Sequence, residues 1–354
     1  PPPPPPPPPL LMSRRPPRPT PKTHRRQRQM CIRDRYAVDS QVARLGIEVR
    51  DRTEAVALIH DGENCLGAVV RCLRTGTHFA VIAKATVIAT GGYGRVYGQY
   101  TTNAVINEGT GASIALDTGI VPLGNMEAIQ FHPTTLAPSG ILVTEGCRGD
   151  GGYLLDRDLN RFMVDAEPEK QELASRDVVC RHMMQVIRDG KGVKASFGQH
   201  LWLDIRHLGE EHVTTKLREV FEICQNFVGL HPAHDLIPVR PTQHYSMGGI
   251  RVNKDGEAYN MSGLFAAGEA ACWDMHGFNR LGGNSLAETL VAGRIVGMRV
   301  ADYVSGRSGD VNTSTALEGV AAAEKRSRDW LEREGSGPGC LLYTSDAADD
   351  NRLV

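Results

Sequence analysis

The residues best suited to chemistry lie in one short loop. The segment TEGCRGDGG, residues 144–152, places the hydroxyl of Thr144, the carboxylate of Glu145 and the guanidinium of Arg148 among glycines. Glycine lets a backbone approach a ligand closely, and a guanidinium binds carboxylates through paired hydrogen bonds. The loop therefore fits a small anionic ligand. A plain surface turn has the same composition, so the choice depends on which other residues converge on this loop.

Two residues outside the loop could complete such a site, and each has a simpler explanation. His132 precedes Pro133, which favours an extended backbone, so we expect a loop to hold its ring as a ligand or as a packing residue. Arg176 lies in the first turn of the helix predicted for residues 172–190, where a cation opposes the partial positive charge of the helix start. Arg176 either points into a site or forms a surface salt bridge with Glu172 or Asp177.

Glycines and a carboxylate follow two apolar segments. The run of residues 81–90 ends at Gly91 and Gly92, and a short buried strand predicted for residues 264–266 is followed by Glu269. Ligands of α/β sheets bind at the carboxyl ends of strands, where a carboxylate can accept hydrogen bonds from ribose hydroxyls. These two segments therefore suggest a dinucleotide near the strand ends.

A helix predicted for residues 285–304 begins near this segment. Asn284 or Ser285 is suited to cap its amino end, whose free N–H groups would favour an anion or an electron-rich ring. His244 and Arg280 are further polar residues near glycine pairs, and His244 lies in a loop-to-strand pattern at residues 240–250.

The elements expected in the first part of the chain are several strands followed by a helix. Short β-branched runs separated by turn signals predict strands over residues 47–50, 54–60 and 65–74, followed by the run of residues 81–90. Residues 107–120 read as a helix opened by glycine. The strands form a meander that leads into a buried strand with a glycine turn at its carboxyl end, where α/β sheets bind ligands.

The composition of the 354 residues excludes several classes of protein. The hydrophobic content is 41% and the net charge is −1, as in ordinary soluble enzymes. No run approaches the roughly 18 apolar residues of a membrane helix. Eight cysteines are scattered without a Cys-x-x-Cys pair, which predicts free thiols and neither a metal site nor an iron–sulfur cluster.

The two ends differ from the rest of the chain. Residues 1–35 open with nine prolines and carry nine Lys or Arg against one Asp, a composition that does not bury a core. We predict a non-native or disordered tail, because residues 23–35 and 341–350 resemble translated adapter sequence. A basic arm that binds nucleic acid is the alternative, and we expect no nucleic-acid partner.

Six motifs in order carry a family resemblance. QFHPTTL, LVTEGCRGDGG, ELASRD, QHYSMGGI, GLFAAGEA and HGFNRLGGNSL are similar to segments of the flavoprotein subunits of succinate dehydrogenase and fumarate reductase. The resemblance covers residues 36–336. It implies an incomplete FAD-binding Rossmann-like domain of the α/β class, interrupted by an α+β capping domain.

The resemblance also implies domain boundaries. The FAD-binding domain would comprise residues 36–125 and 241–306, and the capping domain residues 126–240. Residues 307–339 would begin a helical carboxyl-terminal region, and residues 340–354 would form a second non-native or disordered tail. The first βαβ unit of the family, with its Gly-x-Gly-x-x-Gly phosphate loop and its site of covalent flavin attachment, is expected before residue 36 and is not found in this sequence.

The motifs assign roles to individual residues by similarity. The residues that resemble substrate carboxylate ligands are His132, Thr144, His244 and Arg280. Arg176 resembles the proton donor, with Glu145 and Arg148 as its relay. The expected contacts of the cofactor FAD are Gly91, Gly92, Glu269, Asn284, Ser285 and Leu286. Thr110 departs from the family, where many relatives carry an acid beside the flavin.

The implied activity is the interconversion of succinate and fumarate in a quinone-linked respiratory complex. Electrons would leave to a separate iron–sulfur subunit and to membrane quinone-binding subunits, because this chain lacks cluster ligands. We expect a peripheral location on the cytoplasmic face of the bacterial inner membrane, without direct membrane insertion. Two alternatives stay open: an L-aspartate oxidase with similar motifs, and an inactive fragment that does not retain FAD.

Overall fold

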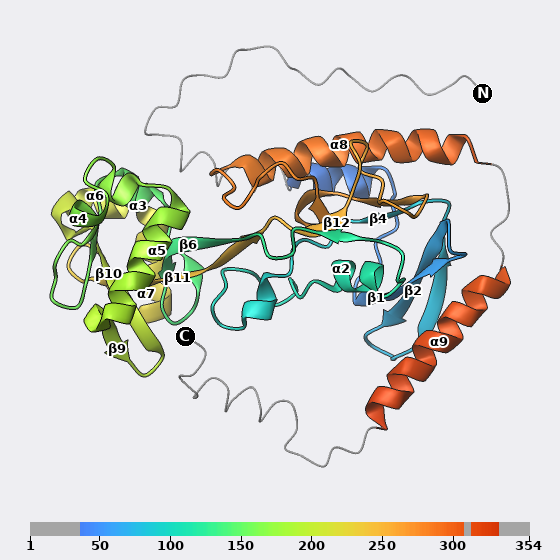
Figure 1. Cartoon of the computed structure of the whole chain (residues 1–354), viewed down its shortest axis with the longest axis horizontal. Coiled ribbons are helices and arrows are strands. Elements are labelled where there is room, and N and C mark those ends of the chain that lie inside the picture. The colour runs from blue at the N-terminus through green and yellow to red at the C-terminus, as the bar shows by residue number, and fades with distance from the viewer. Residues whose placement is uncertain (1–35, 308–312, 333–354) are drawn as a thin grey trace, which may run out of the picture. The chain divides into compact units, whose positions relative to one another are not determined.

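The computed structural model describes residues 36–307 and 313–332, and contacts divide the chain into two units between Val49 and Arg50 (Figure 1). Residues 36–44 of the first unit are helical. The strand predicted over residues 47–50 is wrong, since these residues have no regular structure. Ile47 and Val49 are exposed, so their apolar side chains are not packed in a core. The predicted tails, residues 1–35 and 340–354, lie outside the described residues.

The second unit begins with an antiparallel sheet of three strands in the order β1-β2-β3 (Figure 1). Their bounds are β1 (Thr53–His60), β2 (Cys65–Cys72) and β3 (His78–Ile82). The sequence therefore predicted β1 and β2 correctly. Helix α9 (Thr313–Leu331) packs on this sheet, with Ala316 and Ala323 buried against Ile59 and Val69.

A pair of parallel strands reaches the region of the predicted cofactor contacts. Strand β13 (Leu264–Ala266), as predicted, pairs with β4 (Thr86–Ile88). The run of residues 81–90 is not a single strand, because its first two residues end β3 and a short break precedes β4. Helix α2 (Thr110–Leu116) lies within the predicted range of residues 107–120.

Two further sheets lie among the described residues. The smaller has the order β14-β12-β5, with β5 (Leu123–Gly124), β12 (Gly249–Arg251) and β14 (Ala271–Cys272). The larger has the order β7-β6-β11-β10-β8, with β9 paired to β10. Its strands are β6 (Ile129–Leu136), β7 (Ile141–Leu142), β8 (Tyr153–Leu155), β9 (Val193–Ala195), β10 (Gly198–Asp204) and β11 (Ile237–Ser246).

Strands β6 and β11 are antiparallel, and their register shifts twice. Strand β11 continues across residue 240, where the capping domain was predicted to end. Residues 240–246 are therefore strand rather than loop. The division into an FAD-binding and a capping domain stays a prediction.

The larger sheet shares a hydrophobic core with the helices around it. These helices are α3 (Gly146–Gly149), α4 (Met163–Ala166), α5 (Arg176–Val186), α6 (Glu210–Thr215) and α7 (Arg218–Val228). The short turns of the chain are η1 (Gly94–Tyr97), η2 (Gln171–Leu173), η3 (Ile187–Lys191), η4 (Arg206–Leu208) and η5 (Gly268–Ala270). Helix α5 starts later than predicted, because Ser175 has an extended backbone that separates it from η2.

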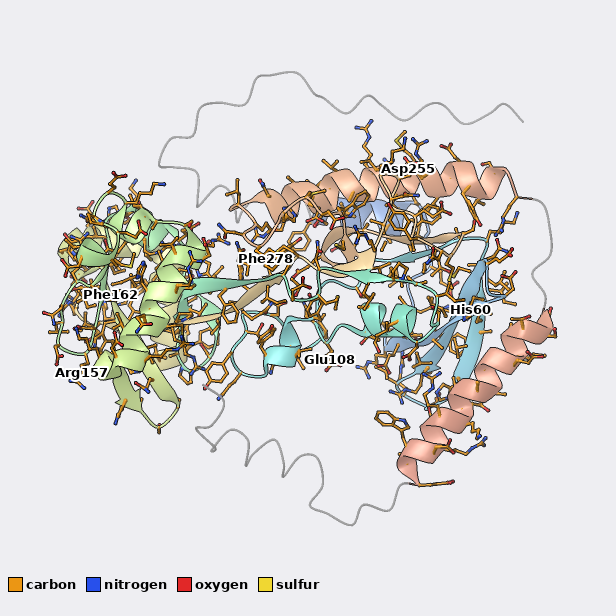
Figure 2. All side chains as sticks on the ribbon, viewed as in Figure 1. His60, Glu108, Arg157, Phe162, Asp255 and Phe278 are labelled. Atoms are coloured by element: carbon orange, nitrogen blue, oxygen red, sulfur yellow. The ribbon has the colours of Figure 1, made fainter. Side chains whose placement is uncertain are left out.

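Helix α8 (Asn284–Ser305) follows η5 and β14, and Asp255, labelled in Figure 2, accepts a hydrogen bond from its Arg299. The predicted cap was wrong. Gly283 is the N-cap, and no side chain caps the helix. Its φ of 83° is a left-handed conformation that glycine adopts without strain. Asn284 and Ser285 therefore lie inside the helix.

Candidate functional site

Glu145 joins two arginines from different elements. It lies just before α3, which carries Arg148, while Arg176 is the first residue of α5. Nε and Nη2 of Arg176 donate to the two carboxylate oxygens of Glu145 at 3.2 and 3.1 Å. Nη2 of Arg148 donates to Oε1 of the same carboxylate at 3.0 Å. We call these three residues the Arg148–Glu145–Arg176 chain.

The surface salt bridge considered for Arg176 is not formed. Glu172 is buried and binds Arg161 at 2.7 Å, and Asp177 pairs with Arg181 at 3.1 Å. Arg176 instead adds a hydrogen bond to Oε1 of Gln130 at 3.2 Å. Its side chain is 12% exposed, so of the two alternatives Arg176 points into the interior and not to the surface.

Burial and charge act in opposite directions on the pKa values of the Arg148–Glu145–Arg176 chain. Burial alone would raise the pKa of Glu145, but the hydrogen bonds and positive charges of Arg176 and Arg148 outweigh it and lower the pKa. Burial lowers the pKa of Arg148, and Glu145 partly offsets that effect. The carboxylate is therefore held ionised between two guanidinium groups.

Two histidines lie on neighbouring strands of the larger sheet. His132 is in β6 and His244 is in β11, and their ring centroids are 5.2 Å apart. The extended backbone of His132 was predicted correctly, but the loop was not, because Pro133 continues in the strand. Oγ1 of Thr102 lies 2.8 Å from Nδ1 of His244 and helps to orient that ring.

Both imidazoles are held neutral. Burial, with the neighbouring His244 and Arg176, lowers the pKa of His132 well below its usual value of 6.5. Burial, followed by the charges of Arg176 and Arg280, lowers the pKa of His244 to about 3. Neutral imidazoles at this place offer N–H donors to a ligand without adding charge.

Arg280 approaches the same region from the segment between β14 and α8, where Figure 2 labels Phe278. Its side chain is buried, and Nη1 donates to the carbonyl of Leu281 at 2.9 Å. Gln130 donates to the carbonyl of Arg280 at 2.6 Å while its own Oε1 accepts from Arg176. Gln130 thus connects the two arginines. The sequence analysis missed it, although it is the first residue of the QFHPTTL motif.

A second group missed from the sequence lies behind Arg280. The guanidinium of Arg280 stands over the ring of Tyr245, 4.5 Å from its centroid. The hydroxyl of Tyr245 donates to Glu288 at 2.6 Å, and Nε2 of His276 lies 2.8 Å from the same carboxylate oxygen. Tyr245 and His276 lie in two of the six motifs and Glu288 lies outside them, so only the tertiary structure brings these three residues together.

Thr144 is placed differently from the other predicted ligands. Its hydroxyl accepts the N–H of Gly146 at 3.2 Å and so supports the turn into α3. The structure therefore gives it a role in the loop itself, while its role toward a ligand stays a prediction.

The predicted cofactor contacts gather at the ends of β4 and β13. A Cβ on Gly92 would stand 2.6 Å from Oε1 of Glu269, so only glycine leaves room for this carboxylate. Glu269 accepts the N–H of Ser246 at 2.8 Å, and burial raises its pKa to about 7. Gly91 has a φ of 75°, which also favours glycine.

The start of α8 lies beside the Arg148–Glu145–Arg176 chain. A Cβ on Gly282 would be 3.5 Å from Nη2 of Arg176 and 3.6 Å from Oε2 of Glu145. The first N–H groups of a helix have no partner within it and attract electron-rich groups. Glu269 lies at the strand ends, and Ser285 and Leu286 lie in this first turn, while their contacts with FAD stay predictions.

A family described as an FAD binding domain matches residues 21–286. This chain belongs to that family. The match confirms the FAD-binding assignment and the predicted cofactor, and the helices and sheets of the chain agree with this fold.

Several relatives of the FAD-binding family are similar to this chain. It is 49% identical over 323 residues to the fumarate reductase flavoprotein subunit of Helicobacter pylori, which covers 84% of this chain and 44% of the relative. The corresponding Escherichia coli subunit is 40% identical over 289 residues, 78% of this chain and 47% of the relative. The succinate dehydrogenase flavoprotein subunit of Rickettsia felis is 44% identical over 257 residues, 70% of this chain and 42% of the relative.

Solved structures agree with these similarities. A quinol-fumarate reductase with menaquinol molecules has a TM-score of 0.76 and 38% identity, and it covers 81% of this chain and 51% of its own. The resemblance inferred from the six motifs is therefore confirmed. The chain spans about half the length of the curated relatives it matches.

Proposed function

We propose that the protein to which this chain belongs interconverts succinate and fumarate, as the catalytic flavoprotein subunit of a quinone-linked complex. The observation that carries this proposal is the meeting of two guanidiniums with two neutral imidazoles. The charges of Arg176 and Arg280 both act on His244, whose ring centroid lies 5.2 Å from that of His132. Guanidinium and imidazole N–H groups from two sides suit a ligand with two carboxylates.

The proposed ligands would hold a dicarboxylate at both ends. Arg280 and His244 would bind one carboxylate, and His132 and Thr144 the other. Because both histidines are held neutral by burial and by the arginines, they would donate hydrogen bonds and leave the charge balance to the guanidiniums. Binding at both ends would align the substrate carbons for reaction.

FAD, when bound, would exchange a hydride with one of the two central carbons of the substrate. During fumarate reduction Arg176 would give a proton to the neighbouring carbon, and during succinate oxidation it would take that proton back. An isolated guanidinium rarely loses a proton. The hydrogen bonds of the Arg148–Glu145–Arg176 chain would allow Arg176 to be reprotonated as it reacts.

The proposed setting follows from the same reasoning. The relatives are named as flavoprotein subunits, and one similar solved structure contains menaquinol. Electrons would therefore pass to an iron–sulfur subunit and then to a membrane quinone-binding subunit. We place the protein on the cytoplasmic face of the bacterial inner membrane. No helix in the described part of the chain is long and apolar enough to cross a membrane.

The proposal is tested by anaerobic bleaching of flavin absorbance in the full-length protein. Succinate and L-aspartate are added separately, and we expect bleaching by succinate alone. Bleaching by L-aspartate would assign the protein to the L-aspartate oxidases and remove the proposed partners. Failure of purified residues 1–354 to retain flavin, where the full-length protein retains it, would favour the inactive-fragment alternative for this chain.

A further inference from the structure

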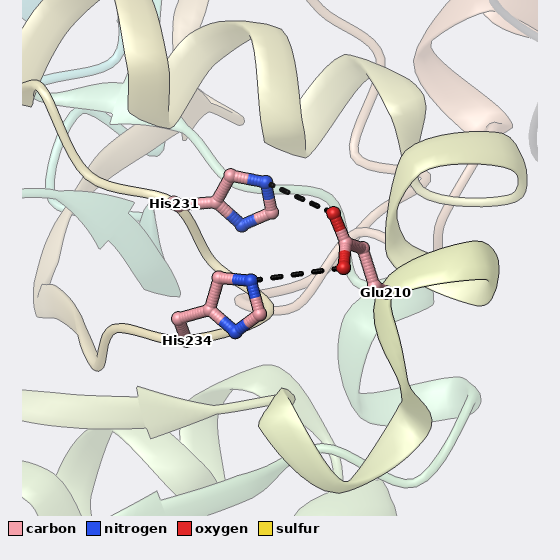
Figure 3. Close-up of side chains that lie close together, drawn as sticks. All are labelled: Glu210, His231 and His234. Atoms are coloured by element: carbon pink, nitrogen blue, oxygen red, sulfur yellow. Dashed lines mark ion pairs between the residues drawn. The ribbon is translucent and has the colours of Figure 1, made fainter.

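We propose that Glu210, His231 and His234 bind a divalent transition-metal ion of the zinc class. Figure 3 shows both imidazoles turned toward one carboxylate. Nε2 of His231 is 3.9 Å from Oε1 of Glu210, and Nε2 of His234 is 3.8 Å from Oε2. The three ligand atoms lie within 4.8 Å of one another. We call these residues the Glu210 cluster.

The spacing of the donors suits an ion that is bound after a small adjustment. Ligands about 2.0–2.1 Å from a tetrahedral zinc ion stand roughly 3.3 Å apart. The two N···O distances of 3.9 and 3.8 Å exceed this by about 0.5–0.6 Å. The side chains of Glu210 and His234 are 62% and 61% exposed, so both can move this far without disturbing a core.

A tight turn holds the two histidines on the same side. The backbone N–H of His231 donates to Oδ2 of Asp235 at 2.8 Å, and the N–H groups of His234 and Asp235 both donate to the carbonyl of His231 at 2.8 Å. The rings are stacked with centroids 4.6 Å apart and an angle of 25°. Phe221 packs edge-on against His231, with ring centroids 5.0 Å apart. Two of the three ligands are therefore placed before an ion arrives.

The chemistry of the donors selects the class of ion. Imidazole nitrogen suits zinc, copper and nickel, whereas calcium and magnesium prefer oxygen ligands throughout. Three protein ligands leave one position of a tetrahedral ion for water, as in an open site. Nδ1 of His231 is buried without a hydrogen-bond partner among the described residues. Metal-binding histidines usually have such a partner, so we expect an exchangeable site rather than a permanently occupied one.

The alternative is that Glu210 only forms ion pairs with the histidines. Both N···O distances exceed hydrogen-bond length, and exposed ion pairs contribute little to stability. An ion pair also gives no reason for two rings to present the same nitrogen to one carboxylate. A bound ion would join the first residue of α6 to the turn that precedes β11.

The sequence predicted no metal site, because it contains no short Cys and His spacing typical of zinc ligands. His231 and His234 are three residues apart, but Glu210 is distant in sequence and joins them only through the packing of α6. This inference is independent of the proposed redox function.

The test is a titration of the full-length protein with zinc, in which calorimetry measures the binding. We compare the wild type with Glu210→Gln and His234→Ala, both of which change exposed side chains. The matched control is His182→Ala, because His182 lies 3.9 Å from Glu167 without a second histidine in the pair. We expect apparent zinc affinity to fall about tenfold or more in the two cluster variants and to stay unchanged in the control.

Two results would overturn the proposal. One is zinc affinity that is equal in the wild type and both cluster variants, or absent up to millimolar zinc. The other is a thiolate charge-transfer band after cobalt substitution, which would place the ion on a cysteine. Thermal unfolding without zinc checks that each variant is folded, and the second cluster variant keeps the test decisive if one variant fails to fold.

Discussion

Arg176 is held by three hydrogen bonds to side chains from two other elements. Two go to Glu145, which precedes α3, and one goes to Gln130 in β6. Such a bidentate pair has a fixed geometry that lysine, with a single ammonium group, does not reproduce. The position of its guanidinium, rather than its charge alone, is therefore what a substitution at Arg176 changes.

We predict that Arg176→Lys leaves dicarboxylate binding largely intact but lowers turnover by at least about a hundredfold, because proton transfer loses its donor geometry. Steady-state kinetics and fumarate binding on the full-length protein measure the two effects. The control is Arg181→Lys, an exposed arginine on the same helix that pairs with Asp177, and its turnover should match the wild type. Near-normal turnover of Arg176→Lys would remove the proton-donor assignment.

At the scale of elements, close contacts between helices and strands depend on particular glycines. Gly111 in α2 lies against β4 and the residues after it, where an added Cβ would stand 2.2 Å from Oγ1 of Thr90 and 2.6 Å from Cγ2 of Ile88. Gly293 in α8 has open space around the corresponding position. Replacing glycine by alanine at these two positions should therefore have opposite effects on the free energy of unfolding.

We predict that Gly111→Ala lowers the free energy of unfolding by about 1–3 kcal/mol, since the methyl group overpacks the contact between α2 and β4. Gly293→Ala, as its matched control, should raise it by about 0.5–1 kcal/mol, because alanine favours a helix. Urea unfolding of the two variants measures both values. Equal changes in the free energy of unfolding in the two variants would mean that the close contact between α2 and β4 does not require glycine at position 111.

At the scale of the whole molecule, the buried histidines connect folding to pH. The pKa of His244 is lowered from 6.5 to about 3, so below pH 6.5 the unfolded chain binds more protons than the folded chain. The contribution of neutral His244 to the free energy of unfolding is fully present above pH 6.5. It is lost as the pH falls toward 3. The pKa of Glu145 is also lowered, so its contribution to the free energy of unfolding is lost only at a pH below 4.5, the usual pKa of a glutamate.

We predict that the free energy of unfolding falls by about 1.4 kcal/mol per pH unit for His244 between pH 6 and about 4. His244→Gln removes this ionisable group and should lower the total slope by that amount, leaving the part that His132 contributes. His182→Gln, at a partly exposed side chain, should keep the wild-type slope. Urea unfolding at several pH values gives the slopes. Identical slopes in the wild type and His244→Gln would show that His244 does not carry this pH dependence.

Local patterns in the sequence determined a large part of this protein. Apolar periodicity and turn residues located β1, β2, α2, β13 and α8, because these elements depend on neighbours along the chain. Six motifs identified the FAD-binding family and named the polar residues of the site. The strand over residues 47–50 failed because apolar alternation forms a strand only where a partner surface exists.

Only the tertiary structure decided how those residues meet. Pairing of β6 with β11 brings His132 beside His244, and packing of α5 brings Arg176 to Glu145 rather than to Glu172 or Asp177. Tyr245, Glu288 and the Glu210 cluster were missed for the same reason. Contacts between distant residues depend on strand register and helix packing, which no short stretch of sequence encodes by itself.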